Sequence, residues 1–208
     1  MISILAFSNA KEEFEKAWQN PDYTQIELEP VDVNGVLEKH YSTSEPLHFT
    51  RRMLWDMEAK KARDPKTYIP HVVRVGKSWG RKTLRDREEF FMRSSQQLAW
   101  ISDVYGQVLE EVYLSHKDQK VIFLGRAELL SEDGTRVHAG SHQPLFHVEH
   151  AVGGIESRPL NLWRIVHLTT GKDHRLMKRF AQMGTSDLLP EFIAIYIEKD
   201  LRIKLTHR

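Results

Sequence analysis

The sequence predicts an α+β domain in which a curved, mainly antiparallel sheet, a half-open barrel, packs on one long central helix. Three observations predict this fold. Apolar residues recur with a helical period over residues 90–112, they alternate from residue 120 onward, and the chain before them is mainly helical in pattern. We therefore expect a single domain over residues 1–208, helix-rich in 1–119 and sheet-rich in 120–208.

The amino-acid composition excludes several kinds of site and of partner. The 30 Lys and Arg residues nearly balance the 29 Asp and Glu residues, so only a local patch could attract nucleic acid or an anionic membrane. The chain has no cysteine, which excludes disulfides, thiolate metal sites and a cysteine nucleophile. No apolar run approaches the roughly 20 residues of a membrane span, and no signal sequence is evident. We expect a soluble, cytoplasmic protein that has no membrane partner.

The first elements follow from local signals. The apolar run 1–7 predicts a strand, and Phe14 and Trp18, which are four residues apart, predict a short helix after it. Residues 25–31 are expected to form a second strand. A half-buried helix over residues 46–64 then begins with one proline and ends before another.

The central element is expected to be the long helix. Before it, residues 69–75 alternate as a strand does, and the basic, glycine-containing residues 76–87 indicate a connection. The apolar face of the helix would consist of Phe90, Leu98, Ile101, Tyr105, Val108 and Val112. A helix this long and this apolar is expected to lie across the core.

The second half of the chain is expected to form hairpins. Asp133-Gly134 and Gly153-Gly154 each separate two alternating runs, which is a strong hairpin signal. One helix is expected at residues 173–183. The predicted strands are 121–130, 135–139, 145–152, 160–169, 191–198 and 201–205.

The main candidate site is the histidine-rich stretch 138–150, which holds four of the eleven histidines. If residues 145–152 form a strand, successive side chains point to opposite faces of the sheet. His147 and Glu149 then share one face, and His150 lies on the other. The alternative is an exposed sheet face on which both are ordinary solvent-side residues.

An imidazole and a carboxylate on one strand face suit two kinds of chemistry. His147 and Glu149 can act as a catalytic base and its partner. They can also ligate a divalent metal ion, with His167 or His142 as a further ligand. The sequence therefore predicts His147 and Glu149 as catalytic residues, and His147, Glu149 and His167 as metal ligands.

A pocket between the C-terminal sheet and the long helix would place this pair beside a bound small molecule. Arg164 is available for an anionic group of the ligand, and His167 lies nearby in the sequence of strands. Trp100 and Tyr105 have polar ends that need partners when buried. These four are the predicted ligand-binding residues, and plain core is the alternative interpretation of the aromatic side chains.

A second candidate site is the basic stretch 71–87. A strand, a glycine turn that carries Lys77 and Ser78, and the start of a helix can bind phosphate through backbone N–H groups. Arg81 and Lys82 add positive charge, so these four are the predicted anion-binding residues. The stretch lacks a glycine that a P-loop requires, and a solvated charged loop is the alternative.

The sequence therefore supports two alternative functions. The first is a small-molecule-binding protein or an enzyme that uses His147 and Glu149. The second is a nucleic-acid or polyanion-binding module that uses residues 71–87, whose affinity would fall steeply with salt. A role in protein interaction is a third interpretation.

Overall fold

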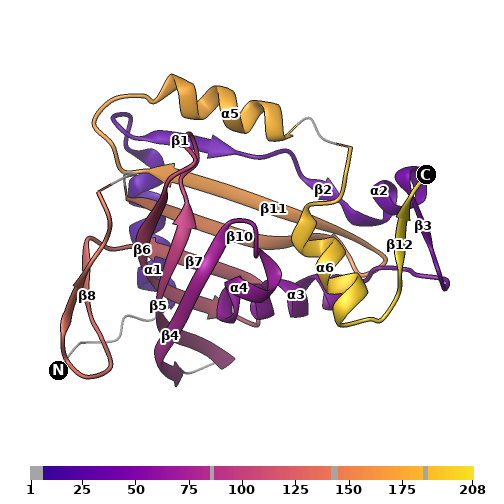
Figure 1. The fold of residues 1–208 in the computed structure, drawn as a ribbon, viewed down its shortest axis with the longest axis horizontal. Helices are drawn as coiled ribbons and strands as arrows, with labels where there is room; N and C mark the ends of the chain where they lie inside the picture. Colours follow the sequence, from indigo (N-terminus) through magenta and orange to yellow (C-terminus); the bar gives the residue numbers. More distant parts are fainter. Residues whose placement is uncertain (1–6, 85–86, 142–144, 185–186) are drawn as a thin grey trace.

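The computed structural model describes residues 7–84, 87–141, 145–184 and 187–208 (Figure 1). The strand predicted at residues 1–7 lies outside this part of the chain, except for Phe7, which begins a helix. The helices are α1 (Phe7–Gln19), α2 (Val33–His40), α3 (Arg51–Arg63), α4 (Pro65–Tyr68), α5 (His174–Gly184) and α6 (Glu191–Lys199).

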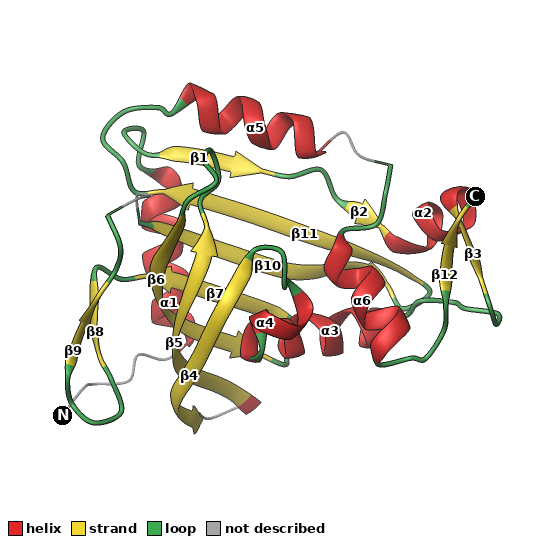
Figure 2. Cartoon of the chain, viewed as in Figure 1, coloured by secondary structure: helices red, strands yellow, loops and turns green. Residues whose placement is uncertain are grey.

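One large antiparallel sheet organises the fold (Figure 2). Its strands are β1 (Thr24–Glu27), β2 (Val31–Asp32), β4 (Val73–Thr83), β5 (Glu88–Leu98), β6 (Tyr105–Ser115), β7 (Lys120–Gly125), β10 (Phe146–Ile155) and β11 (Arg158–His167). The main strand order is β1-β11-β10-β7-β6-β5-β4, and β2 also pairs with β11. Small sheets join β3 (Tyr41–Thr43) to β12 (Leu205–His207) and β8 (Glu128–Leu130) to β9 (Arg136–His138).

The α+β class and the curved antiparallel sheet are confirmed, but the sheet is open. Within the described residues, β1 and β4 form its two edges and do not pair with each other. None of the helices described is long and apolar enough to cross a membrane.

The long central helix predicted over residues 90–112 is wrong. These residues form β5 and β6, which pair in one antiparallel register from Glu88 with Ser115 to Leu98 with Tyr105. Side chains on both faces of this hairpin are buried in the two hydrophobic cores. Because a strand buried on both faces need not alternate, its apolar spacing can imitate that of a helix.

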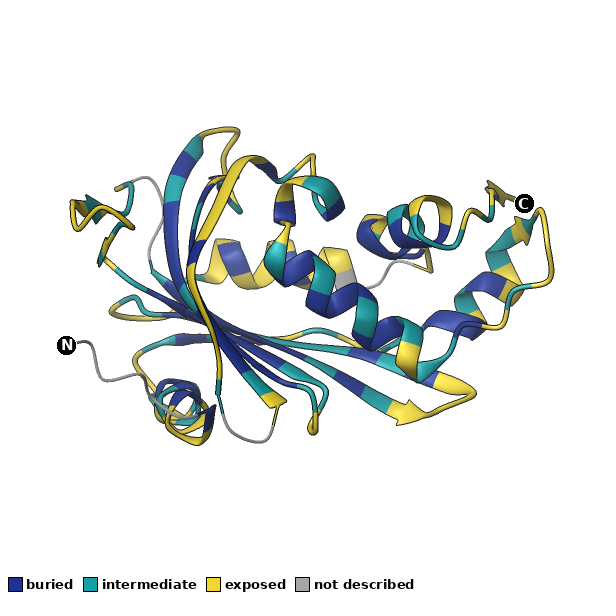
Figure 3. Cartoon of the chain, turned by 90° about the horizontal axis from the view of Figure 1, so that it is seen from below, coloured by how far each residue is buried: buried dark blue, intermediate teal, exposed yellow. Residues whose placement is uncertain are grey.

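Helices cover both faces of the sheet (Figure 3). On one face, hereafter the α1 face, Phe14 and other apolar residues of α1 pack against Tyr113, Ile122 and Val166. On the other face, the α3 face, side chains of α2, α3, α5 and α6 pack against residues such as Phe123. The strand predicted at residues 191–198 is helix α6, because Phe192 and Tyr196 form an inward helical pair.

Candidate functional site

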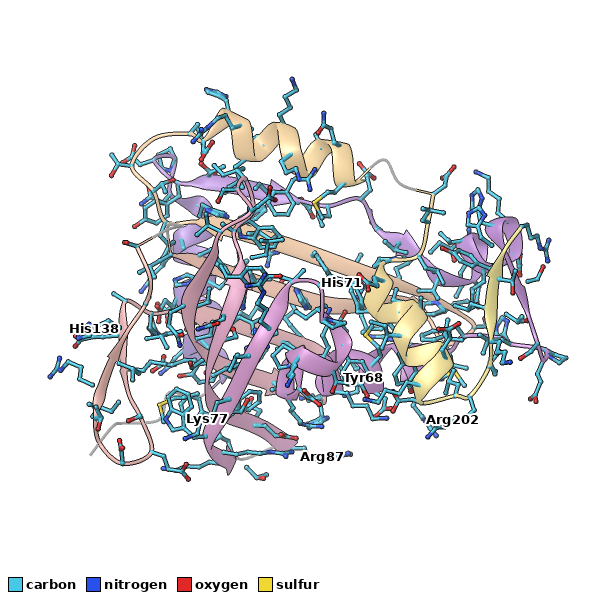
Figure 4. All side chains as sticks on the ribbon, in the orientation of Figure 1. Tyr68, His71, Lys77, Arg87, His138 and Arg202 are labelled. Atoms are coloured by element: carbon cyan, nitrogen blue, oxygen red, sulfur yellow. The ribbon has the colours of Figure 1, made fainter. Side chains whose placement is uncertain are left out.

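The histidine-rich stretch does not gather into one site. His138 lies on the exposed β8–β9 hairpin, 3.7 Å from Glu128 (Figure 4). His142 is outside the described residues. His147 lies on the α1 face next to Glu13, whereas His150 contacts Glu58 of α3 on the opposite face. The structure therefore confirms the prediction that His147 and His150 point to opposite faces of this strand.

His147 is buried under α1 and lines a groove of about 460 Å³ between α1 and the ends of β7 and β10. Its Nδ1 accepts a hydrogen bond of 3.1 Å from the backbone N–H of Gly125. Burial lowers the pKa of His147 to about 4, so the ring is neutral at pH 7 and carries its proton on Nε2. Nε2 lies 3.6 Å from Oε1 of Glu13.

Glu149 and Arg164 connect the sheet to α1. The guanidinium of Arg164 binds Glu149 at 2.7 Å and Glu15 of α1 at 2.6 Å. The second carboxylate oxygen of Glu149 lies 2.8 Å from Nζ of Lys120. Glu149 is therefore paired with cations and not with His147, and Arg164 faces away from the α3 face.

The predicted metal ligands are not brought together. His147 and Glu149 lie on the α1 face, whereas His167 contacts the ring of Phe146 on the α3 face. In the part of the chain that the structure describes, no group of three or more His, Asp or Glu side chains could hold a metal ion. The residues present therefore do not fit the predicted divalent metal site.

A buried polar network that the sequence did not indicate lies on the α3 face. The carboxylate of Glu58 accepts hydrogen bonds from Lys61 at 2.9 Å and from Asn161 at 2.8 Å. It also lies 2.9 Å from Nδ1 of His150. Five of the residues 58–64 are charged, and the helix over residues 46–64 was expected to be only half buried. Glu58 and Lys61 are nevertheless 1% and 3% exposed.

Electrostatics fix the protonation of this network. Burial alone would raise the pKa of Glu58. The charge and the hydrogen bonds of Lys61 and His150 outweigh this effect of burial and lower the pKa to about 2. Burial lowers the pKa of Lys61 to about 8 and that of His150 to about 4. At pH 7 a neutral His150 therefore donates its Nδ1–H to an ionised Glu58.

An aromatic cluster lies on the α3 face beneath α5. The ring centroid of Trp100 is 4.7 Å from that of Phe180 in α5 and 6.0 Å from that of Phe146. His167 lies on the other side of the cluster, 5.7 Å from Phe146. Two predicted ligand-binding residues, Trp100 and His167, thus pack against the same phenylalanine.

The polar atoms of this cluster have no partners. Nε1 of Trp100 and both ring nitrogens of His167 are buried, and none of them makes a hydrogen bond within the described structure. His167 is 1% exposed, and burial lowers its pKa to about 4, with Asp173 opposing the shift. His167 is therefore neutral at pH 7 and presents one unused donor and one unused acceptor.

Tyr105 does not join this cluster. Its hydroxyl donates a hydrogen bond of 3.1 Å to the backbone oxygen of His71, and the guanidinium of Arg74 lies 3.6 Å from its ring centroid. His71 lies just before β4, and Arg74 lies in β4. Tyr105 therefore contacts the start of the edge strand and not the aromatic cluster.

The basic stretch is a strand and not the predicted glycine loop. Residues 73–83 form β4 at the edge of the sheet, and the chain returns as β5 from Glu88, so among the described residues of this stretch no α-helix follows the glycines. The predicted phosphate-binding architecture is therefore not formed. Lys77 lies 3.6 Å from Glu132, and Ser78 bonds to the backbone oxygen of Arg63.

The two other predicted anion-binding residues of β4 differ in their surroundings. Arg81 lies 2.7 Å from Glu89, and Glu89 also binds Arg63 and His116. Lys82 is exposed on the edge strand. Basic side chains on an edge strand are a common protection against pairing with another sheet.

Comparison with known proteins gives a likeness of fold. No protein-family model matches the chain, and no curated protein matches its sequence. Among solved structures, it is similar to the Zhui aromatase/cyclase from Streptomyces sp. R1128, with a TM-score of 0.50 and 7% identity over 86% of this chain and 95% of that chain. At this identity the likeness concerns the fold alone.

Two further solved structures have lower scores. A START superfamily protein from Mycobacterium smegmatis has a TM-score of 0.46 and 9% identity, over 78% of this chain and 97% of that chain. The major latex-like protein 151 from Panax ginseng has a TM-score of 0.43 and 11% identity, over 78% of this chain and 94% of that chain.

Proposed function

We propose that the protein binds a small aromatic molecule that carries a hydroxyl group, in the cluster beneath α5. The observation that carries this proposal is the set of unpaired nitrogens in Trp100 and His167. A buried polar group without a partner costs about 1–3 kcal/mol. A hydroxyl group can accept from the indole N–H and donate to the imidazole, so a bound ligand would remove this cost.

The lining of the cluster supports an aromatic ligand. Trp100 contacts the rings of Phe146 and Phe180, and His167 contacts the ring of Phe146. Another aromatic ring packs favourably against such rings. The fold likeness to a protein named an aromatase/cyclase also supports a small organic ligand. This proposal retains the small-molecule function expected from the sequence but not the pair of His147 and Glu149.

The helix α5 is the cover of the proposed site. Between residues 174 and 183 only Leu176 and Phe180 are buried, and the rest of the helix is exposed. Displacing two apolar side chains costs far less than opening the sheet. We therefore place ligand entrance under α5.

The first test compares 2-naphthol with naphthalene, which lacks the hydroxyl group, by titration of ligand fluorescence. The wild-type protein is expected to bind 2-naphthol roughly tenfold more tightly, which corresponds to one or two hydrogen bonds. His167→Leu and Trp100→Phe are each expected to reduce this preference.

The matched control is Trp79→Phe. The indole N–H of Trp79 donates to the backbone oxygen of Leu130, so its loss should leave the preference for 2-naphthol unchanged. Equal affinities of the wild-type protein for the two compounds would contradict the proposed hydroxyl site.

The stability of the ligand-free protein gives an independent prediction. His167→Leu removes unpaired buried nitrogens and keeps an apolar side chain of similar size, so the free energy of unfolding should rise by about 1 kcal/mol. Urea denaturation measures this change. A loss of stability would mean that His167 has a partner in the free protein, and that no ligand is needed to satisfy it.

A further inference from the structure

We propose that α5 and the turn between β5 and β6 dock on the surface of an anionic lipid bilayer. This proposal goes beyond small-molecule binding and does not depend on it, and it revises the expectation from the sequence that the protein has no membrane partner. The whole chain is nearly neutral, so such an attraction requires a local patch. The surface in question is called the α5 patch, and it consists of Ile101, Val104, Arg175, Met177, Lys178, Arg179 and Met183.

Positive charge is concentrated on α5. Residues 172–183 contain four Lys or Arg and one acidic residue, Asp173. The side chain of Asp173 accepts hydrogen bonds from the backbone N–H groups of Arg175 and Leu176, so it caps the helix. Its carboxylate therefore caps the helix and makes no ion pair with the basic side chains among the described residues.

Three of these basic side chains are free to bind an anion. Arg175, Lys178 and Arg179 are exposed, and within the described structure none of them has an ion pair or a side-chain hydrogen bond. By contrast, Arg126 and Arg164 on the α1 face are not free to bind an anion, because each of them already binds two carboxylates.

Apolar side chains are exposed on the same helix and on the turn that contacts it. Ile101 and Val104 in the β5–β6 turn are each 43% exposed, and Met177 and Met183 on α5 are 40% and 44% exposed. The turn and the helix are in contact, because the rings of Trp100 and Phe180 are 4.7 Å apart. Asp103 is the acidic residue of this turn.

A bilayer surface is the partner that uses both features. Anionic headgroups attract Lys and Arg near the membrane, and the interface accepts aliphatic and methionine side chains. Nucleic acid would use the charges but gain little from exposed Ile, Val and Met side chains. The combination therefore favours a lipid surface.

The experiment is sedimentation of the full chain with vesicles. One set contains phosphatidylcholine alone, and the other contains phosphatidylcholine with phosphatidylglycerol. We expect binding to the anionic set, weakened by salt. Replacing Arg175, Lys178 and Arg179 together by Gln should weaken that binding roughly a hundredfold, at about 1 kcal/mol per basic residue.

A second variant tests the apolar contribution. Ile101→Ser with Val104→Ser should weaken binding to anionic vesicles even at high salt, where the charge contribution is screened. Both sets of substitutions lie on exposed side chains, so their circular dichroism and thermal unfolding should match those of the wild-type protein.

The matched control removes the same number of charges elsewhere. Lys77 and Arg87 lie on the opposite side of the molecule from α5 (Figure 4). Replacing Lys77, Lys82 and Arg87 by Gln should leave vesicle binding within twofold of wild type. Absence of binding to anionic vesicles, equal losses in both triple variants, or retardation of RNA without vesicle binding would each overturn the proposal.

The two proposals fail separately. The binding of 2-naphthol is measured without vesicles, and none of the residues changed in the α5 patch is proposed to contact the ligand. A protein that discriminates 2-naphthol from naphthalene but ignores anionic vesicles would retain the ligand site and lose the membrane surface.

Discussion

Replacing Glu58 by Ala is expected to destabilise the protein by about 3–5 kcal/mol, the cost of leaving a buried charge without its partner. The carboxylate is the common acceptor for Lys61, Asn161 and His150. Without it, the ammonium of Lys61 is buried next to the rings of Trp163 and Phe192 and has no counter-charge. Urea denaturation at pH 7 measures the loss.

Two further variants test the reason for this loss. Glu12→Ala removes an exposed carboxylate that pairs with Lys16 on the surface, and it should change stability by less than about 0.5 kcal/mol. Replacing both Glu58 and Lys61 by Met leaves no buried charge and should recover much of the stability. If Glu58→Ala were as mild as Glu12→Ala, the carboxylate would not be what holds α3 on the sheet.

Acid should unfold the protein well above the pKa of ordinary carboxylates. Burial lowers the pKa values of His147, His150 and His167 to about 4, whereas an unfolded histidine titrates near 6.5. Between these two values the unfolded chain binds up to three more protons than the folded chain. The free energy of unfolding therefore falls as the pH drops from about 6.5 to 4.

The slope of this fall can be measured. Three protons correspond to at most about 4 kcal/mol per pH unit in the steepest part of the window. Glu58, with a pKa of about 2, adds a loss in the same direction at lower pH. Urea denaturation at pH 7.5, 6 and 5 gives the slope directly.

Two variants test which histidines bind the protons that are responsible for this slope. His167→Leu should remove about one third of the slope, whereas His138→Leu on the exposed β8–β9 hairpin should leave it unchanged. A stability that does not change between pH 7.5 and 5 would show that these imidazoles are not buried in their neutral form.

Local patterns predicted the second half of the chain better than the first. The runs on either side of Gly153-Gly154 predicted the β10–β11 hairpin, but the turn predicted at the two glycines is wrong. Gly153 and Gly154 pair with Leu160 and Pro159 inside the hairpin, and the chain turns at Glu156 and Ser157. The same reasoning failed for residues 90–112, since most side chains of β5 and β6 are buried on both faces of the sheet and their apolar residues do not alternate. Apolar periodicity alone cannot separate such strands from a buried helix.

The candidate site could be predicted only in part. Trp100 was recognisable because its polar end needs a partner when buried, and His167 was singled out as a histidine on a strand expected near His147 and Glu149. Their proximity depends on the pairing of Phe146 with His167 across β10 and β11, and on the contact of Trp100 with α5. The network around Glu58 joins α3, β10 and β11 in the same way, and no local spacing in the sequence indicates it.

The five tryptophan indoles offer the most direct test of the proposed ligand site. Their N–H groups are observed by proton–nitrogen correlation NMR with and without 2-naphthol, and Trp100→Phe assigns the resonance of Trp100. We expect that resonance to shift on addition of 2-naphthol, whereas those of Trp55 and Trp79, which donate to His116 and Leu130, stay in place. A Trp100 resonance that stays unchanged at saturating 2-naphthol would contradict the account.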